Sequence, residues 1–241
     1  MSRFFVPPFF GDTVTITGED AHHIYRVLRM KIGEKITVCD GIGHDYACTV
    51  TALSDTDVQL QVVEQSETTC EPTTAVTLYQ GLPKSDKMEW IIQKCVEIGI
   101  TRIVPVAMSR SVVKLNAAEG EKKQKRWQKI AAGAAEQSGR GCIPEVALPI
   151  SFNEALKQLQ NEYVITFYEG GGESLSALVD ANTRQVSIVV GPEGGFDVSE
   201  IEQLQQHGAK TATLGKRILR CETAPLVALS VIMQLTENLN L

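Results

Sequence analysis

The residues best suited to chemistry lie in two loops near the carboxyl end of the chain. GPEGGF at 191–196 follows an apolar run typical of a buried strand, and GKRILRCETAP at 215–225 follows a second strand. Glycines let a ligand approach the backbone closely, so the first loop suits a ligand held by main-chain hydrogen bonds and apolar packing, such as an adenosine. Arg220 and Glu222 could stabilise charge or accept a proton. An Arg and a Glu two residues apart can equally form a surface ion pair, and glycine loops can simply turn the chain.

Phosphate is an unexpected ligand for these loops. No Gly-Lys-Ser/Thr follows the first loop, and the pattern G-x-G-x-x-G occurs nowhere in the chain. GGGES at 170–174 is the nearest approach to a dinucleotide loop, but the acidic residue expected about twenty residues later is matched only by Asp180, which comes too soon. A nucleotide-dependent enzyme that uses this segment stays open as an alternative.

An alternation of strands and helices from residue 75 onward must position these loops. Such alternation predicts a parallel α/β sheet covered by helices, in which ligands bind beyond the carboxyl ends of the strands. The expected strands are 75–82, 100–108, 163–168, 185–190 and 210–214, and the expected helices are 85–99, 120–139, 197–208 and 224–239. Asp197 and Glu200 have capping-box spacing, so the loop at 191–196 should connect a strand to a helix.

The first 72 residues have a different sequence pattern. Short alternating strands broken by Asp40, Gly41 and Gly43 predict a small barrel or sandwich, with a short helix at 19–30. The polar, aperiodic segment 64–74 marks the expected boundary between domains 1–72 and 73–241.

Composition narrows the classes of protein further. The formal charge is −6, yet residues 84–140 hold twelve Lys or Arg against six Asp or Glu, which makes this segment a candidate phosphate-binding surface or a solvated helix face. Six cysteines without a C-x-x-C pair argue against a zinc or redox motif. No segment suits a signal peptide or a membrane span, so a cytoplasmic protein with reduced thiols is expected.

Several segments in order resemble one family over nearly the whole chain. The sequence is similar to the SPOUT superfamily of methyltransferases, and within it to the RsmE family of 16S rRNA uridine N3-methyltransferases. The segments that carry the resemblance are HHIYRVLRMKIGEKITVCDG at 22–41, KSDKMEWIIQKCVEIGI at 84–100, SRSVVK at 109–114, AAEQSGR at 134–140, VGPEGGF at 190–196 and LGKRILRCETAP at 214–225.

The resemblance implies a PUA-like β-barrel followed by an α/β SPOUT domain whose chain forms a C-terminal trefoil knot. It implies a homodimer with its sites at the interface, S-adenosylmethionine as cofactor, 16S rRNA as substrate, preferably within the assembled small subunit, and neither a metal nor a membrane. The residues that it places around the cofactor are Phe167, Tyr168, Gly191, Pro192, Glu193, Gly194, Leu214, Gly215, Ile218, Leu219 and Ala224.

Catalysis and RNA binding follow as hypotheses. Arg220 could stabilise charge on the uracil oxygens, or hold a phosphate, while Glu222 accepts the N3 proton or orients the base; Glu193 is also within reach. Cys221 is expected to pack and not to act as a nucleophile. The expected RNA contacts are Arg3, Arg26, Arg29, Lys31, Arg110, Lys114 and Arg140. Alternatives are another SPOUT methyltransferase that modifies tRNA or rRNA at a ribose or base, and a non-catalytic RNA-binding protein on the same scaffold.

Overall fold

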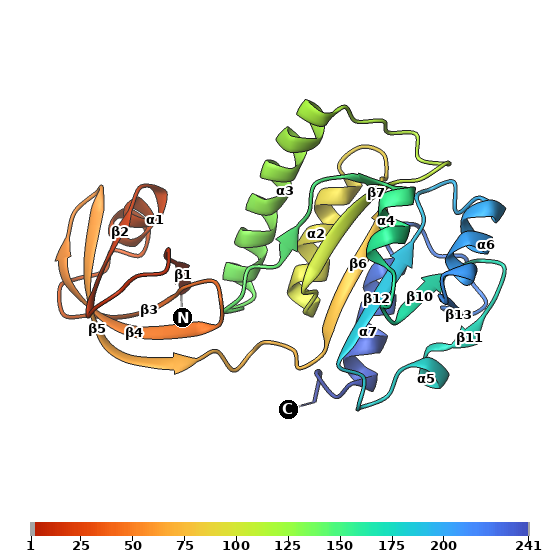
Figure 1. Ribbon diagram of the computed structural model, residues 1–241. Coiled ribbons are helices and arrows are strands. Elements are labelled where there is room, and N and C mark those ends of the chain that lie inside the picture. The colour runs from red at the N-terminus through yellow and green to blue at the C-terminus, as the bar shows by residue number, and fades with distance from the viewer. Residues whose placement is uncertain (1–2, 241) are drawn as a thin grey trace. The chain divides into compact units, whose positions relative to one another are not determined.

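The structure, a computed structural model, describes residues 3–240, which pack as two compact units (Figure 1). The division falls between Glu71 and Pro72, and Ala135–Ile143 belongs with the N-terminal unit. The sequence pattern assigns residues 135–143 to the second domain. The structure places them otherwise because they bond to the N-terminal unit, as described below. The assignment of separate roles to 1–72 and 73–241 stays a prediction.

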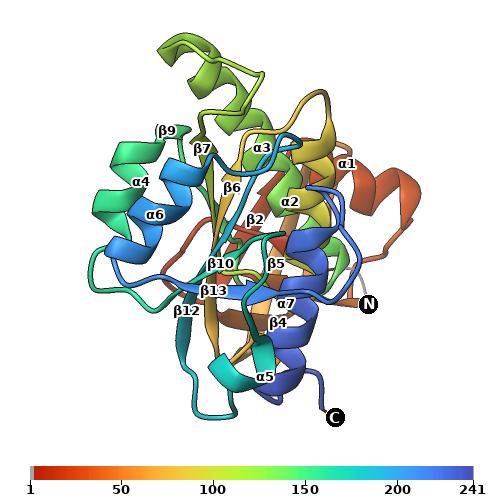
Figure 2. The same ribbon diagram turned by 90° about the vertical axis from the view of Figure 1, so that its right-hand side faces the viewer.

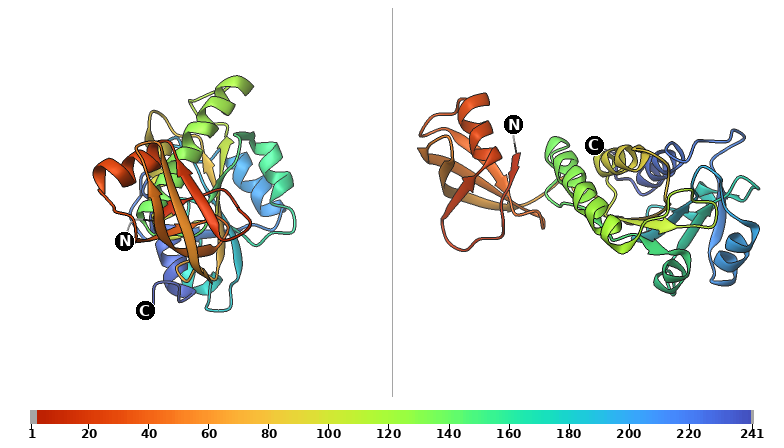
Figure 3. Two further views of the ribbon diagram at one scale, coloured as in Figure 1. Left: turned by 90° about the vertical axis from the view of Figure 1, so that its left-hand side faces the viewer. Right: turned by 90° about the horizontal axis from the view of Figure 1, so that it is seen from above.

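The N-terminal unit is built on a small curled sheet of five strands in the order β1-β3-β4-β5-β2 (Figure 3). All neighbours are antiparallel except β1 and β3. In β2, Val14 and Ile16 are buried while the flanking threonines are exposed, which is the period-two pattern of a half-buried strand. The elements are β1 (Arg3–Phe5), β2 (Thr13–Thr17), α1 (Glu19–His22) with a π-helical turn (His23–Val27), β3 (Lys35–Cys39), β4 (His44–Leu53) and β5 (Asp57–Glu67).

A buried ion pair ties residues 135–143 to this unit. The Arg140 side chain is only 5% exposed, and its Nη2 lies 2.6 Å from Oε2 of Glu71. Oε1 of Glu71 accepts the backbone N–H groups of Gly141 at 2.9 Å and Cys142 at 3.0 Å. Burial by itself would raise the pKa of Glu71, but Arg140 and these N–H groups outweigh it and hold the pKa below its usual value.

The C-terminal unit contains an eight-stranded sheet in which every described pairing is parallel, which confirms the predicted α/β class. The strand order is β11-β13-β10-β12-β6-β7-β8, with β9 paired to β7. The strands are β6 (Ala75–Gly81), β7 (Arg102–Ala107), β8 (Glu145–Val146), β9 (Ile150–Ser151), β10 (Val164–Phe167), β11 (Glu173–Ser174), β12 (Gln185–Val190) and β13 (Lys210–Thr213). The sequence pattern does not predict the two-residue strands β8, β9 and β11, because so short a run carries no period.

Helices cover both faces of this sheet (Figure 2). On one face α4 and α6 enclose a core that includes Tyr79, Val189 and Phe196, and on the other face α2 packs against α7. The helices are α2 (Lys87–Ile98), α3 (Ala117–Gln137), α4 (Phe152–Gln158), α5 (Leu175–Leu178), α6 (Val198–Gln206) and α7 (Ala224–Leu235). The short helices α4 and α5 are not among the elements expected from the sequence.

Helix ends follow the sequence signals in part. Asp197 and Glu200 form the expected capping box of α6, and Gly99 ends α2 with a φ of 117°. Thr223 precedes α7 but its side chain makes no capping hydrogen bond; its backbone N–H donates instead to the carbonyl of Arg220 at 2.8 Å. Asp86 likewise begins α2 without a side-chain cap.

The order of the central strands decides where the loops meet. β10 lies between β12 and β13, with Phe167 opposite both Val190 and Ala212. Because the carboxyl ends of parallel strands lie at the same edge of the sheet, the loops that follow β10, β12 and β13 emerge side by side. This is the kind of position at which open α/β sheets bind ligands.

Candidate active site

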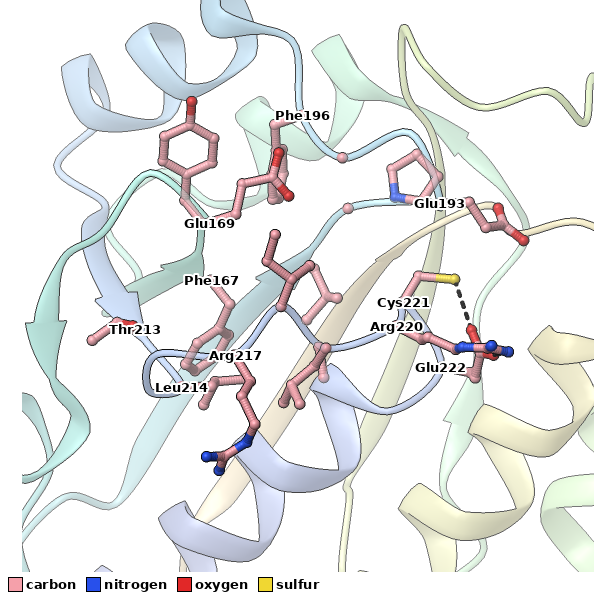
Figure 4. A pocket seen from close by; sticks show the side chains of 18 of the residues that line it. Phe167, Glu169, Glu193, Phe196, Thr213, Leu214, Arg217, Arg220, Cys221 and Glu222 are labelled. Carbon is pink, nitrogen blue, oxygen red and sulfur yellow. Dashed lines mark hydrogen bonds and ion pairs between the residues drawn. The ribbon is translucent and has the colours of Figure 1, made fainter.

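A cavity of about 430 Å³ opens at the carboxyl ends of β10, β12 and β13 (Figure 4). This volume lies in the range of small-molecule sites, roughly 300–1,000 Å³. Its lining comes from the ends of these strands and the three loops that follow them, with Lys87 from α2 and Ala224 from α7. The lining residues are Lys87, Phe167, Tyr168, Glu169, Val190, Gly191, Pro192, Glu193, Gly195, Phe196, Ala212, Thr213, Leu214, Gly215, Lys216, Arg217, Ile218, Leu219, Arg220, Cys221, Glu222 and Ala224.

The first loop is a tight turn with little space for side chains at its glycines. The N–H of Gly195 donates to the carbonyl of Pro192 at 2.9 Å, and Gly195 has a φ of 68°, which favours glycine. A Cβ on Gly191 would lie 3.3 Å from the ring of Phe196, and Phe196 is itself anchored in the core beneath α6. The loop therefore presents backbone to the cavity from a fixed position.

The second loop presents apolar side chains and a second bend. Gly215 has a φ of 100°, and its N–H donates to Oγ1 of Thr213 at 3.2 Å. Ile218 lines the cavity and remains 83% exposed. An apolar side chain this exposed in a loop is suited to cover a flat apolar ligand.

Glu193, Arg220 and Glu222 form a charged cluster at one end of the cavity, away from Phe167 and Leu214, whereas Glu169 and Arg217 lie on the side of Phe167 and Leu214 (Figure 4). Nζ of Lys87 lies 3.0 Å from Oε1 of Glu193 and 3.3 Å from Oε2 of Glu222. Nη1 of Arg220 lies 3.9 Å from Oε1 of Glu222. The Glu222 side chain is 17% exposed, whereas that of Arg220 is 83% exposed. Arg220 is therefore free to reach a bound molecule, while Glu222 is held in place.

Both carboxyl groups are poised in the ionised form. Burial alone would raise the pKa of Glu193, but hydrogen bonds from Lys87 and from backbone N–H groups lower it below the usual value. Burial likewise opposes ionisation of Glu222, and hydrogen bonds from its own N–H, from the Cys221 thiol and from Lys87 lower its pKa. The same hydrogen bonds raise the pKa of Lys87. The cluster thus contains paired opposite charges at neutral pH.

The Cys221 thiol is turned toward Glu222 and is poorly suited to nucleophilic attack. Its Sγ donates to Oε2 of Glu222 at 3.2 Å. Burial, together with this hydrogen bond and the nearby carboxylates, raises the pKa of the Cys221 thiol to about 12. Cys221 therefore stays protonated at neutral pH.

Ten of the eleven residues expected at the cofactor line the cavity, together with Arg220 and Glu222. The exception is Gly194, whose carbonyl accepts a hydrogen bond from Nη1 of Arg110 at 3.2 Å and whose Cβ position is 2.9 Å from Arg110 Cβ. Lys87 lines the cavity although the sequence pattern assigns it no role. One feature of the sequence could have indicated a role for Lys87: it is the first residue of a helix, where the helix dipole disfavours a cation.

The expected RNA-contacting residues differ in their availability. Arg29, Lys31 and Lys114 are exposed. Arg26 is exposed but binds both carboxylate oxygens of Asp55, at 3.0 and 3.2 Å.

The three remaining arginines are all held by protein groups. Arg110 is half-exposed, with its Nη2 3.7 Å from Asp197. Arg3 pairs with Asp45 at 2.6 Å and donates to the Gly139 carbonyl, and only 16% of its side chain is exposed. Arg140 is buried against Glu71. These positions disfavour contact of Arg3 or Arg140 with RNA, because each guanidinium is largely buried and already engaged with a carboxylate.

Two further properties of the described chain bear on the site. Within residues 3–240, no group of three or more His, Cys, Asp or Glu side chains is arranged to hold a metal ion. None of the helices described here is both long and apolar enough to cross a bilayer.

Known proteins resemble this chain in both units. An RNA methyltransferase domain family matches residues 69–233, and an RNA methyltransferase PUA domain family matches residues 16–63. The ribosomal RNA small subunit methyltransferase E of Bacillus subtilis is 42% identical over 94% of this chain and 92% of its own length. The crystal structure of a ribosomal RNA small subunit methyltransferase E from Neisseria gonorrhoeae bound to S-adenosyl methionine is 32% identical, with a TM-score of 0.88 over 98% of both chains. A putative methyltransferase from Legionella pneumophila, with the bound cofactor SAM, is 29% identical, with a TM-score of 0.87 over 97% of both chains.

Proposed function

This chain belongs to the ribosomal RNA small subunit methyltransferase E family, and we propose that it transfers a methyl group from S-adenosylmethionine to N3 of a uridine in 16S rRNA. One observation carries the proposal. The loops after β12 and β13 form a single cavity with two ends: one holds apolar side chains and glycine backbone, with Glu169 and Arg217 beside them, and the other holds the paired charges of Lys87, Glu193 and Glu222. The first end suits a nucleoside cofactor, and the second suits a base that must lose a proton.

The residues of the cavity fit S-adenosylmethionine. The glycines of the first loop bring its peptide groups to the cavity, and a Cβ on Gly191 would press on Gly195 and Phe196 and so disturb this backbone. Phe167, Leu214 and Leu219 supply apolar surface for an adenine ring. When bound, the cofactor supplies a methyl group on a sulfonium, which needs no further activation.

The charged end fits the acceptor. The N3–H of uridine is hardly ionised at neutral pH, so the enzyme must favour the anion. We assign to the Glu222 carboxylate the acceptance of the N3 proton as the bond from N3 to the methyl carbon forms and that from carbon to sulfur breaks. Arg220, which is exposed beside Glu222, stabilises the charge that develops on a uracil oxygen. Both roles also depend on the base being held in line with the methyl group.

RNA binding is assigned to both units. In the N-terminal unit we retain Arg26, Arg29 and Lys31, and in the C-terminal unit Arg110 and Lys114, because these side chains are exposed or half-exposed. Cations of this kind position an RNA backbone without reading its sequence. A net charge of −6 disfavours binding to RNA through charge alone. Recognition of a folded RNA surface therefore matters more, which favours the assembled small subunit as substrate.

Three further assignments rest on the same family. We propose a homodimer with the cavity at its interface, in which the exposed Ile218 would gain cover. We propose the trefoil-knotted threading of the segment that leads into α7. We also place the reaction in the cytoplasm, because small ribosomal subunits are assembled there.

A direct assay tests the proposed function. Small subunits that lack this modification are incubated with the protein and labelled S-adenosylmethionine, and the 16S rRNA is digested and analysed by mass spectrometry. The expected product is one N3-methyluridine per subunit. A methylated ribose or a different base would replace this assignment with another RNA methyltransferase activity. Binding of the subunit without methyl transfer would favour a non-catalytic RNA-binding protein.

A further inference from the structure

Lys87 occupies a position that helix stability does not explain. It is the first residue of α2, where the helix dipole and the unpaired N–H groups favour an acidic side chain and disfavour a cation. Asp86, the residue before it, makes no side-chain cap. The lysine is instead compensated from outside its helix, by Glu193 and Glu222.

These two contacts join parts of the cavity that the chain itself does not connect closely. Glu193 belongs to the loop after β12, which presents its backbone to the cofactor end, and Glu222 belongs to the loop after β13, at the uridine end. Oε1 of Glu193 also accepts the backbone N–H of Lys84 at 3.0 Å, so the turn before α2 is bonded to the same carboxylate. Lys87 thus bridges the two loops.

We propose, on the basis of the function proposed above, that Lys87 is a positioning residue for methyl transfer: its ammonium group holds the Glu222 carboxylate ionised and aimed at the uridine, and ties it to the cofactor loop through Glu193. The charged and titratable groups that face Glu222 are Lys87 from α2, Glu193 from the loop after β12, and Arg220 and Cys221 from its own loop. Arg220 is 3.9 Å away and largely in solvent, so Lys87 is the nearer cation.

The direction of the pH effect follows from this arrangement. Lys87 is one of the groups that lower the pKa of Glu222. Its removal takes away both its hydrogen bond and its positive charge, so that only the Glu222 N–H and the Cys221 thiol remain to offset burial, which disfavours ionisation. If Glu222 must be a carboxylate to accept the N3 proton, loss of Lys87 moves the acid limb of the rate profile to higher pH.

The test compares Lys87→Met with Lys87→Arg and with Lys94→Met. Lys94 lies in the same helix, two turns beyond Lys87, and forms an ion pair with Glu97 at 2.8 Å. Lys94 does not line the cavity. Its replacement therefore removes one positive charge and one ion pair from α2 without altering the cavity. Methyl transfer to small subunits is measured as kcat and KM from about pH 5 to pH 9. For Lys87→Met we expect kcat to fall at least tenfold and the acid limb of kcat/KM to move upward. Lys87→Arg should restore the position of the limb, and Lys94→Met should match the wild type.

A double-mutant cycle separates this role from a purely structural one. If Lys87 acts through Glu222, then Lys87→Met should cost little further activity in a Glu222→Gln background. Should Lys87→Met unfold, Lys87→Gln is measured in the same way. An unshifted acid limb with unchanged kcat, or fully multiplicative losses in the cycle, would overturn the inference about Lys87 while leaving the methyltransferase intact. A wild-type protein that methylates no uridine would instead overturn the proposed function, and this inference with it.

Discussion

Replacement of Arg140 by Ala should destabilise the N-terminal unit and leave the RNA-binding chemistry untouched. The Arg140 guanidinium donates to the Glu71 carboxylate through Nε at 3.2 Å and Nη2 at 2.6 Å, with both groups mostly buried. Removal of one partner leaves the other charge buried without its counter-ion, which costs about 3–5 kcal/mol. For a unit of this size, roughly 80 residues, that corresponds to a fall in the Tm of the unit of roughly 12–40 °C.

Urea unfolding followed by far-UV circular dichroism measures this loss. The matched control is Arg126→Ala, which removes an arginine whose side chain is 69% exposed and pairs with Glu89 at 2.7 Å. A surface pair of this kind contributes about 0–1 kcal/mol. Affinity for small subunits is measured in parallel, at a temperature where both variants are folded.

The pH dependence supplies an independent check. Because the pKa of Glu71 is lowered in the folded state, the stabilisation from this carboxylate is present above its unfolded pKa and is lost as the pH falls through its folded pKa. Wild-type stability should therefore decline below the ordinary glutamate value of 4.5, and Glu71→Gln should decline less over the same range. If Arg140→Ala unfolds at the wild-type urea concentration while subunit binding weakens, Arg140 contacts RNA and the buried pair has been misjudged.

Three further outcomes are expected. Gly81→Ala places a Cβ 2.5 Å from Pro192 Cδ and must displace the loop after β12, so calorimetry should give at least tenfold weaker binding of S-adenosylhomocysteine, whereas Gly133→Ala, with open space around its Cβ, should bind normally. Arg220→Ala should lower kcat while the cofactor affinity is unchanged, because the side chain points into solvent at the uridine end; unchanged turnover would remove it from the mechanism. Replacement of both Arg29 and Lys31 by Ala should weaken subunit binding and reduce its salt slope by about 1 for each phosphate that is no longer neutralised, and an unaltered slope would mean that this surface is only solvated.

The sequence predicted the elements well where they are long and periodic. The alternation of strands and helices from residue 75 predicted a parallel sheet, and the strand-to-helix loop at 191–196 ends in the expected capping box. The resemblance to the RsmE family named residues that the structure gathers around one cavity. Signals of this kind are local: they depend on spacings of two to four residues, which a single stretch of chain carries by itself.

What the sequence by itself determined is therefore the identity of the elements, the chemistry of the loops between them and the family. Only the tertiary structure decided which partners those residues acquire. Lys87 at the start of α2 pairs with Glu193 and Glu222 from the loops after β12 and β13, and Arg140 is buried against Glu71 of the first unit. The sequence does not distinguish a charged side chain that is exposed to solvent from one that is buried in an ion pair. Its desolvation and its counter-ion, which set its pKa and its availability to RNA, depend on contacts between residues far apart in the chain.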